Sequence, residues 1–405
     1  MTRYGRSPWV DEFPASRVPA FPRQRGSLVT DVVIVGGGLT GCATAYAFAA
    51  AGVRVALVEA ARVGLGHTAF SAGWISEDPG AAFGDVEQLI GMRAARHGWQ
   101  SWRRASLDFA ALLRRLDVKC HLEARAAVTI ARTLDQTAQM TRDRKTRTHA
   151  GLDATLLNPR AVSAEVAIDA AAGLRSRDGA TIDPYRACLG LAAAALDRGA
   201  RIFERSAARR IRFGRKDVDV TCPEGSIRAG RIVIATGMPT SLFKALQRHF
   251  WFRTSYLALT ERVPAKTRQL LGRRAAIVRD MATPPHMIRW MGDERLLVCG
   301  ADTEEAPARR RDRIIVQRTG QLMYELSTLY PDISGIQPER GWAADYARTS
   351  DGLPYIGPHR NYPHHLFAFG DASHSVTGAY LASRILLRHY SEELDSADEA
   401  FSFTR

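Results

Sequence analysis

The sequence predicts an α/β protein in which a half with a parallel sheet is joined to an α+β half built on an antiparallel sheet. Three stretches carry this prediction. Residues 31–60 run from an apolar strand through a glycine-rich turn and a helix of small residues to a second strand. Residues 232–237 give another apolar strand that ends in a small-residue turn. Residues 253–302 alternate apolar and polar side chains, as antiparallel strands do.

The composition is that of a globular protein large enough for two domains. Of the 405 residues, 46% are hydrophobic and 24% charged. No apolar run approaches the ~20 residues that cross a membrane, and the start "MTRYGRSPWV" has no apolar segment typical of a secretory signal. Five scattered cysteines with no C-x-x-C pair favour free thiols in a reducing cytoplasm over disulfides or a metal site. They are Cys42, Cys120, Cys188, Cys222 and Cys299.

The net charge of +14 comes almost entirely from arginine, which supplies 51 of the 56 basic residues. Such a skew is more typical of genomic base composition than of a nucleic-acid site. Local clusters stand at 142–147 and 309–313. We expect solvated faces there, with attraction of an anionic substrate, an RNA or a membrane surface as the alternative.

The turn after the first strand has the spacing of a dinucleotide-binding loop. Gly36, Gly38 and Gly41 form G-x-G-x-x-G directly after the apolar run 32–35. In that motif the first glycine makes a tight turn, the second lets the backbone approach a pyrophosphate, and the third lets helix and strand pack closely. The motif alone is weak, and a merely tight turn is its structural alternative.

The residues that follow strengthen this interpretation. The helix expected at 40–51 would point its positive dipole end at the phosphates. The second strand, expected at 53–58, leads to Glu59, which stands 23 positions after Gly36, where an acid accepts hydrogen bonds from ribose hydroxyls. Together these features predict a bound dinucleotide but do not choose between NAD and FAD.

The rest of the chain predicts a regular order of elements. An extended N-terminal arm with four prolines occupies residues 1–28, and a Trp/Leu stripe at helical spacing predicts a core-facing helix over 85–117. The further expected elements are a strand and surface helix at 125–150, helices at 184–198 and 314–330, strands near 202 and at 232–235 and 365–371, and a closing helix at 378–394.

In this order, the segments resemble the FAD-dependent oxidoreductases of the D-amino-acid oxidase superfamily. They are most similar to those of the glycine oxidase, sarcosine oxidase and gamma-glutamylputrescine oxidase type. The matching stretches are "VGLG" after Glu59, "IDPYR" (182–186), "IVIATG" (232–237), "TSDGLPYIG" (349–357) and "FAFGDASHSVTGAYLAS" (367–383). The resemblance covers residues 28–395 and implies FAD rather than NAD.

The resemblance also implies the architecture. We expect a discontinuous, Rossmann-like FAD-binding domain of the glutathione-reductase type, formed by residues 29–80, 150–240 and 336–395. An antiparallel-sheet substrate domain formed by 81–149 and 241–335 is interleaved with it. Residues 1–28 remain as the arm and 396–405 as a tail.

A set of FAD contacts follows from the matched motifs. The loop 370–377 enters the closing helix, whose N-terminus would stabilise negative charge on the reduced ring; a plain strand-to-helix turn is the alternative. The expected cofactor residues are Gly36, Gly38, Gly41, Glu59, Ala60, Gly66, Thr68, Ser71, Ala72, Gly73, Ala208, Ala235, Thr236, Gly237, Gly352, Gly370, Asp371, His374, Ser375, Val376 and Thr377. No metal site is expected.

The sequence also departs from its relatives. Where glycine oxidase-like proteins carry an arginine that pairs with the substrate carboxylate, this chain has Tyr346, and Arg348 follows two residues later. Tyr346 alone predicts a preference for amines without an α-carboxylate, unless Arg348 or Arg289 supplies the charge. Phe70 stands where a flavin-linking histidine would be, and no linking cysteine is found, so we expect FAD to be held non-covalently.

The expected function is FAD-dependent oxidation of the C–N bond of an amine or amino acid, giving an imine that hydrolyses. The expected catalytic or substrate residues are His286, Tyr346, Arg348 and Arg289, although a histidine on an alternating strand is more often packed. The electron acceptor is oxygen or an unidentified carrier, and the oligomeric state is open. The alternatives are a flavoenzyme acting on a modified tRNA base and a non-catalytic FAD-binding assembly protein.

Overall fold

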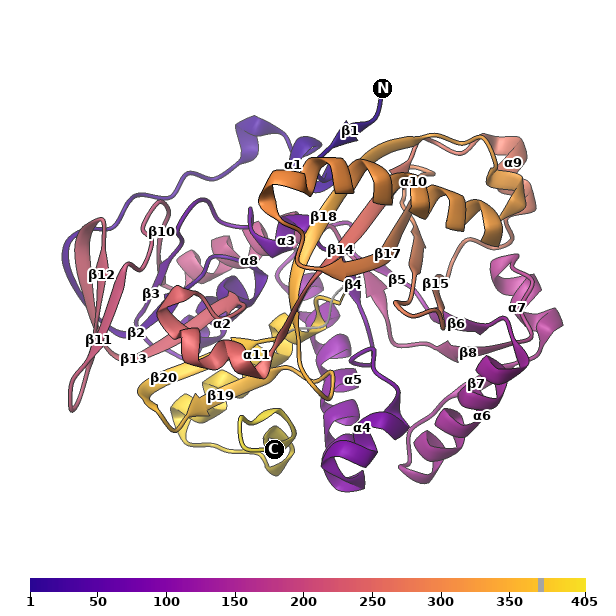
Figure 1. Cartoon of the computed structure of the whole chain (residues 1–405). Coiled ribbons are helices and arrows are strands. Elements are labelled where there is room, and N and C mark those ends of the chain that lie inside the picture. Colours follow the sequence, from indigo (N-terminus) through magenta and orange to yellow (C-terminus); the bar gives the residue numbers. More distant parts are fainter. Residues whose placement is uncertain (371–374) are drawn as a thin grey trace.

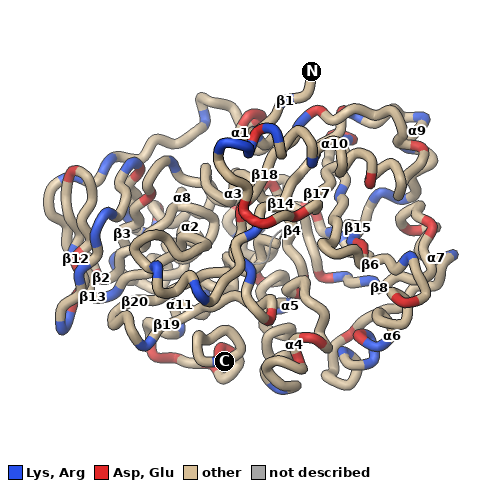
Figure 2. The backbone as a smooth tube through the Cα atoms, in the orientation of Figure 1, with Lys and Arg blue, Asp and Glu red and all other residues tan. Residues whose placement is uncertain are grey.

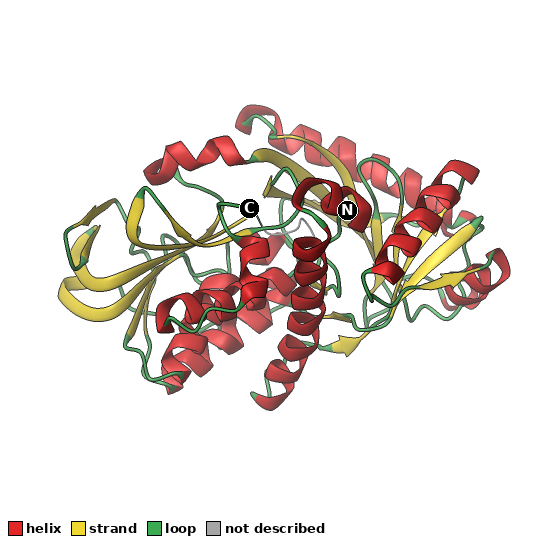
Figure 3. Ribbon diagram, turned by 90° about the horizontal axis from the view of Figure 1, so that it is seen from below, coloured by secondary structure: helices red, strands yellow, loops and turns green. Residues whose placement is uncertain are grey.

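The computed structural model describes residues 1–370 and 375–405. Within these residues the strands form an eight-stranded, a nine-stranded and a three-stranded sheet. Figure 1 shows two lobes, each built around one of the large sheets. From below, the molecule is elongated, with the large sheets towards its two ends and helices packed along the middle (Figure 3).

The eight-stranded sheet contains the predicted βαβ unit. Its central strands pair in parallel, and the apolar run 32–35 is almost completely buried, as a strand covered on both faces requires. Helices α2, α8 and α11 pack together against it. The strand order is β10 (Arg201–Phe203), β3 (Val55–Val58), β2 (Arg25–Val35), β13 (Glu224–Gly237), β12 (Val218–Cys222) and β11 (Arg210–Phe213), with β20 (Tyr362–Phe369) paired to β13 and to β19 (Tyr355–His359).

The nine-stranded sheet includes the antiparallel region predicted at 253–302. It is covered partly by α10, which contacts four neighbouring strands. The strand order is β1 (Arg3–Tyr4), β18 (Pro338–Arg348), β14 (Trp251–Thr260), β17 (Leu296–Glu304), β16 (Met287–Trp290), β15 (Ile277–Asp280), β6 (Ala127–Ala131), β8 (Ala172–Ser176) and β7 (Thr155–Leu157). The small sheet consists of β4 (Trp74–Ile75), β9 (Ala180–Thr181) and β5 (Glu123–Ala124).

One expected helix is divided in two. The stripe at 85–117 forms α4 (Phe83–Ile90) and α5 (Met92–Arg115), because Gly91 between them has φ +83°, outside the helical region. Five other helices lie close to their expected places. They are α2 (Leu39–Ala50), α6 (Leu134–His149), α8 (Pro184–Asp197), α10 (Arg311–Leu329) and α11 (Thr377–Ser391). Four short helices were not expected: α1 (Pro8–Asp11), α3 (His67–Phe70), α7 (Pro159–Val166) and α9 (Ala265–Leu270). Short 3₁₀ turns stand at 15–17, 241–249, 308–310, 331–333 and 396–401.

The N-terminal arm is docked on the body of the protein. Strand β1 pairs in parallel with β18, and Trp9 is buried, with its Nε1 donating to the carbonyl of Ser71 at 2.9 Å. Asp11 accepts a hydrogen bond from the buried Arg340 at 2.6 Å. The arm therefore wraps the core, as its proline-rich sequence predicted.

The sheets divide the chain differently from the expected domain boundaries at three strands. The boundaries place β7, β8 and β18 with the FAD-binding domain, but all three belong to the nine-stranded sheet. β18 pairs along its whole length with β14, and β8 pairs with β6. Strand partners are chosen across long sequence distances, so chain position alone does not identify them.

All five cysteines are free and buried, and the Sγ atoms of Cys42 and Cys188 lie 3.6 Å apart. In the part of the chain that the structure describes, no helix is long and apolar enough to cross a membrane. In the same residues, no group of three or more histidine, cysteine or acidic side chains is placed to hold a metal ion. Figure 2 shows basic residues in both lobes, interspersed with acidic ones.

Candidate functional site

Two glycines of the dinucleotide loop are required by the packing of the protein itself. Gly36 has φ +110°, and a Cβ on it would lie 2.6 Å from the carbonyl oxygen of Ala235. A Cβ on Gly41 would lie 1.8 Å from the carbonyl oxygen of Gly36. These contacts hold the ends of β2 and β13 and the start of α2 together, so the predicted GxGxxG and ATG motifs form one structure.

Gly38 is different, and it provides a test of whether a dinucleotide fits. Its φ of −77° is ordinary, and a Cβ on it would meet only the hydroxyl of Thr68, at 3.3 Å. As the N-cap of α2, it also offers no side chain to the first-turn amide groups. The packing of the protein therefore does not explain the glycine at this position. A pyrophosphate that approaches the backbone at the N-terminus of α2 would explain it.

Glu59 lies at the end of β3 with its carboxylate against the loop. One oxygen accepts the amide of Gly37 at 2.7 Å and the other that of Ala61 at 2.8 Å. A carboxylate has about four acceptor positions, so lone pairs remain for two ribose hydroxyls. Ala60 is exposed beside it, and Ser206, two residues before the half-buried Ala208, donates its amide to the carbonyl of Glu59.

The loop 66–73 is held by both lobes. Gly66 is the N-cap of α3, Thr68 accepts the amide of Leu39 at 2.8 Å, and Ser71 accepts that of Gly73 at 3.2 Å. At its end, the buried guanidinium of Arg289 donates to the carbonyl oxygens of Ala72 at 2.8 Å and Gly73 at 2.7 Å.

The C-terminal segment meets this loop. The amide of Gly370 donates to the carbonyl of Gly237, and Thr236 lies in the same turn. Val376 donates its amide to the carbonyl of Trp74, and Thr377 its hydroxyl to that of Ser76. The predicted cofactor residues of four separate segments are thus neighbours, while Asp371 and His374 lie outside the described residues.

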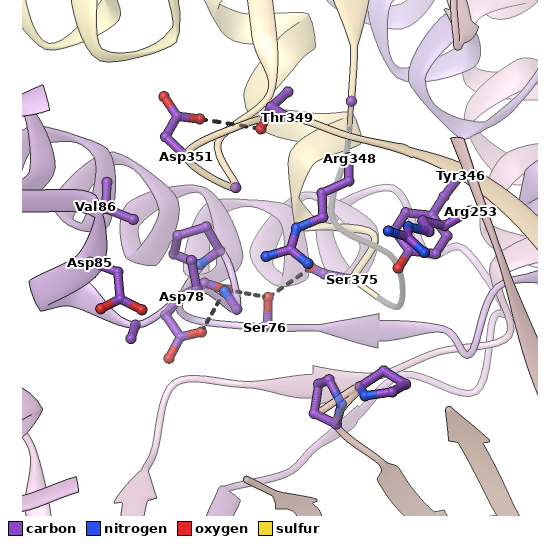
Figure 4. A pocket seen from close by; sticks show the side chains of 18 of the residues that line it. Ser76, Asp78, Asp85, Val86, Arg253, Tyr346, Arg348, Thr349, Asp351 and Ser375 are labelled. Carbon is purple, nitrogen blue, oxygen red and sulfur yellow. Dashed lines mark hydrogen bonds between the residues drawn. The ribbon is translucent and has the colours of Figure 1, made fainter. Parts of the chain in front are cut away.

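Beside these segments lies a cavity of about 550 Å³ (Figure 4). The predicted residues His286, Tyr346, Arg348, Gly352, Gly370 and Ser375 line it. Trp74 and Ser76 also line it, and the hydroxyls of Ser76 and Ser375 are 2.7 Å apart. Arg253, Arg279, Asp78, Asp85, Asp302 and Asp351 complete its charged lining.

Two arginines of the cavity have no carboxylate partner among the described residues. Arg253 lies on β14 directly opposite Tyr346 of β18, and Arg348 is the last residue of β18. Figure 4 shows the Arg348 side chain reaching from its strand towards Ser375, with Arg253 and Tyr346 to one side. Within the part of the chain that the structure describes, the cavity therefore holds two guanidinium groups without an ion-pair partner, and such groups can bind an anion.

Tyr346 uses its hydroxyl proton within the protein. It donates to one carboxylate oxygen of Asp302 at 2.6 Å, while Ser255 donates to the other at 2.5 Å. Burial and the neighbouring Asp302 carboxylate raise the pKa of Tyr346 well above that of a free tyrosine. The phenol oxygen consequently presents lone pairs, rather than a proton, to a substrate.

His286 is held between two carboxylates. Its Nδ1 lies 2.7 Å from Asp280 and its Nε2 2.7 Å from Glu325. Burial lowers the pKa of His286, but the two carboxylates outweigh it, so the pKa is raised overall. Both ring nitrogens are engaged, and His286 has no free nitrogen for a substrate proton in this arrangement.

Arg289 is placed away from this cavity. Besides the two loop carbonyls, its guanidinium contacts the carbonyl of Ile182 and lies 5.3 Å from the ring centre of Trp9. It lines a second cavity of about 600 Å³, which the N-terminal arm helps to form. Of the two arginines expected to replace the family's carboxylate ligand, only Arg348 lines the cavity that contains Tyr346.

The opposite part of the cavity carries charges of both signs. Asp78 pairs with the buried Arg147 at 3.3 Å, and Arg279 donates to the carbonyl of Gly80. Burial lowers the pKa of Arg279. Asp85 lies exposed in the first turn of α4, and Figure 4 shows it on the side of the cavity away from Tyr346.

Arg253 and Asp302 line the cavity but were not among the residues predicted from the sequence. Both stand in the stretch that alternation identified as antiparallel strands, so their elements were predicted. What was missing was the register that places Arg253 opposite Tyr346. The signal available in the sequence was a charged residue at each end of that stretch, which by itself does not identify a site.

Comparison with known proteins connects both parts of the site to a family. The model of the DAO family, described as FAD dependent oxidoreductase, matches residues 31–388. Gamma-glutamylputrescine oxidoreductase of Escherichia coli K12 is 25% identical over 389 residues, covering 94% of this chain and 89% of the relative. Glycine oxidase of Bacillus licheniformis is 24% identical over 384 residues, covering 88% and 93%.

Solved structures agree on the fold. The crystal structure of glycine oxidase from Geobacillus kaustophilus superposes with a TM-score of 0.76 at 20% identity, covering 93% of this chain and 99% of that one. L-amino acid deaminase from Proteus myxofaciens, in complex with anthranilate, gives a TM-score of 0.77 at 15% identity, covering 100% and 99%.

Proposed function

The chain belongs to the DAO family of FAD-dependent oxidoreductases, and we propose that it oxidises the C–N bond of an amine that carries a carboxylate, giving an imine that hydrolyses in water. The observation that supports this substrate class is the pair of guanidinium groups, Arg253 and Arg348, that line the cavity beside Tyr346 and have no carboxylate partner within residues 1–370 and 375–405. The named activities of the relatives on glycine, amino acids and gamma-glutamylputrescine support the choice of an amine.

The residues that would hold FAD are those of the glycine loop, Glu59, loop 66–73, Gly237 and the segment entering α11. When bound there, FAD would supply the two-electron oxidant that this reaction needs. All remaining tasks fall to side chains of the cavity: they bind the substrate, orient that carbon and take up a proton from its nitrogen.

Arg348 and Arg253 bind the carboxylate. An arginine–carboxylate pair fixes distance and angle through parallel hydrogen bonds, so it orients the substrate as well as binding it. The tyrosine at position 346 then need not carry a charge.

Tyr346 and Asp302 bind the substrate nitrogen and remove its proton. An amine in water is a cation that has no lone pair to assist loss of hydride, so its proton must leave first. The phenol oxygen of Tyr346 takes the proton of that nitrogen and passes its own hydroxyl proton to Asp302, whose carboxylate oxygen lies 2.6 Å away. The negative charge of Asp302 also stabilises the cation when it binds. His286 stays paired with its two carboxylates and shapes the wall.

Anaerobic reduction of the bound flavin by matched pairs of compounds tests the proposal. Each pair is an amine and its α-carboxylated counterpart, for example methylamine with glycine and dimethylamine with sarcosine. We expect the carboxylated member to reduce the flavin faster in most pairs. Faster reduction by the uncarboxylated members would contradict the role of the arginines, and no reduction by any amine would support a non-catalytic FAD-binding protein instead.

A further inference from the structure

Residue Arg405 lies in the tail outside both expected domains, yet its side chain is among the most completely bonded in the molecule. The guanidinium makes five hydrogen bonds, as many as it has N–H groups. Two go to the carboxylate of Asp351, at 2.6 and 3.0 Å, and the others to the carbonyl oxygens of Leu353, Pro354 and Ser402. The group also lies 4.0 Å from the ring centre of Tyr355.

This ion pair is buried on both sides. The side chains of Arg405 and Asp351 are 3% and 4% exposed. Burial alone would raise the pKa of Asp351, but Arg405 reverses this and holds the pKa below its usual range. A buried carboxylate that loses its partner is strongly unfavourable, so the segment carrying Asp351 is stable in this conformation only with Arg405 in place.

That segment forms part of the cavity wall. Residues 348–352 line the cavity, and Asp351 also accepts the hydroxyl of Thr349 and the amide of Leu353. Arg348 is the first of these residues and stands at the point where β18 ends. Figure 4 shows Asp351, Thr349 and Arg348 along one turn of chain above the cavity.

We propose that Arg405 is a positioning residue: through Asp351 it fixes the loop 349–353 and thereby the place from which Arg348 reaches the substrate. The structural half of this inference stands by itself, and the functional half rests on the proposed role of Arg348. Arg405 touches neither substrate nor cofactor.

The chain offers a matched control in the same tail. Arg388 of α11 makes a bidentate ion pair with Asp398, whose side chain is also 4% exposed. This pair holds the tail without contacting the loop 349–353. Arg388→Met and Arg405→Met each remove an arginine that anchors residues 396–405 through a buried carboxylate, but only the second leaves Asp351 without its partner.

Hydrogen exchange of the FAD-loaded protein, followed by mass spectrometry, tests the structural half. In Arg405→Met we expect exchange of peptides covering 349–354 to rise at least tenfold, because the loop opens to hydrate Asp351. Arg388→Met should leave it unchanged. The double variant Asp351→Asn/Arg405→Met, which buries no lone charge, should exchange more slowly than Arg405→Met. If Arg405→Met exchanges like the parent, or Arg388→Met loosens the loop equally, the inference is wrong.

Kinetics with the same variants test the functional half. We expect Arg405→Met to raise the KM for the carboxylated member of each pair about tenfold, with a smaller change for the uncarboxylated member. Unchanged KM values with an opened loop would reduce Arg405 to a structural anchor and overturn its positioning role. Should Arg405→Met not fold, Arg405→Lys, which keeps the charge but not the two-fold contact, takes its place. If the parent protein itself shows no preference for the carboxylated amines, the proposed function is wrong. The hydrogen-exchange test of the structural role of Arg405 remains valid in that case.

Discussion

The dinucleotide loop and the substrate cavity are assembled in opposite ways. The loop and its acid fall within residues 36–59. Backbone atoms set the shape of the loop, because the carbonyl oxygen of Gly36 occupies the space that a Cβ on Gly41 would need. The part of the cavity around Tyr346 comes from three strands, with Arg253, Asp302 and Tyr346 brought together by the pairing of β14 with β17 and β18. The dinucleotide loop is therefore a backbone site, shaped by main-chain atoms. The substrate cavity is a side-chain site, formed by charged groups from separate strands.

The difference predicts how each region responds to change. A backbone site has no spare space, so one added methyl group abolishes it. A side-chain site keeps its walls when one charge is removed, so the loss appears in affinity and selectivity. Substitutions in the two regions should therefore differ in the size of their effects and in what they affect.

The largest effect is expected for Gly41→Ala. The added methyl would lie 1.8 Å from a carbonyl oxygen in the backbone, which can move only by separating α2 from β2. We expect a loss of at least about 3 kcal/mol in the free energy of unfolding and no bound flavin. Denaturant unfolding and the flavin absorbance of the purified protein measure both. A stable, yellow Gly41→Ala protein would show that the loop is not set by this contact.

Gly38→Ala adds the same methyl group three residues earlier and should separate binding from folding. Nothing but the Thr68 hydroxyl approaches that position, so the stability of the flavin-free protein should change little. The methyl group would occupy the space of the pyrophosphate, and FAD should be lost. Circular dichroism and flavin content decide this, and stoichiometric FAD in the variant would argue that the loop is an ordinary turn.

Glu59→Ala should have an intermediate effect within the same region. It removes a charged acceptor of the ribose hydroxyls, which contributes roughly 1.5–3 kcal/mol, or about tenfold to a hundredfold in FAD affinity. Titration of the flavin-free variant with FAD measures the change. Unaltered affinity would mean that the Glu59 carboxylate serves only the amides of Gly37 and Ala61.

The smallest effect is expected in the cavity wall, at His286. Because the carboxylates of Asp280 and Glu325 raise its pKa in the folded protein, its stabilising charge is complete below the unfolded value of about 6.5 and is lost as pH rises through the folded value. The Tm of the parent should therefore fall relative to that of His286→Gln between about pH 6 and pH 9. A constant difference across this range would show that His286 does not titrate there.

The contrast also explains which features could be predicted from the sequence. The turns at Gly36 and Gly41 are local consequences of local residues, so β2, α2, β3 and Glu59 were placed correctly. The same holds for α8, which begins at Pro184 with Asp183 as its N-cap. Periodicity gave α4 and α5 but not the break at Gly91, because one glycine in an otherwise amphipathic stretch does not reveal its φ.

Features that depend on pairing between distant strands could not be predicted. The alternation around Arg289 shows that it lies on a strand, but not which of two cavities it borders; the structure places it under the loop carbonyls of Ala72 and Gly73. β18 joins the nine-stranded sheet because β14 pairs with it, which nothing in its own sequence specifies. The Arg405–Asp351 pair joins residues 54 positions apart through a tail with no recognisable motif.

The most direct measurement of the central claim compares Arg348→Met with the parent in binding matched carboxylated and uncarboxylated amines, monitored by anaerobic flavin reduction. Arg360→Met, at an exposed arginine in the turn between β19 and β20, serves as the control. Loss of a charged hydrogen-bond partner predicts a weakening of about tenfold to a hundredfold for the carboxylated compounds alone, with FAD content unchanged. Equal weakening of both compounds, or none, would contradict the claim that this cavity selects its substrate through Arg348.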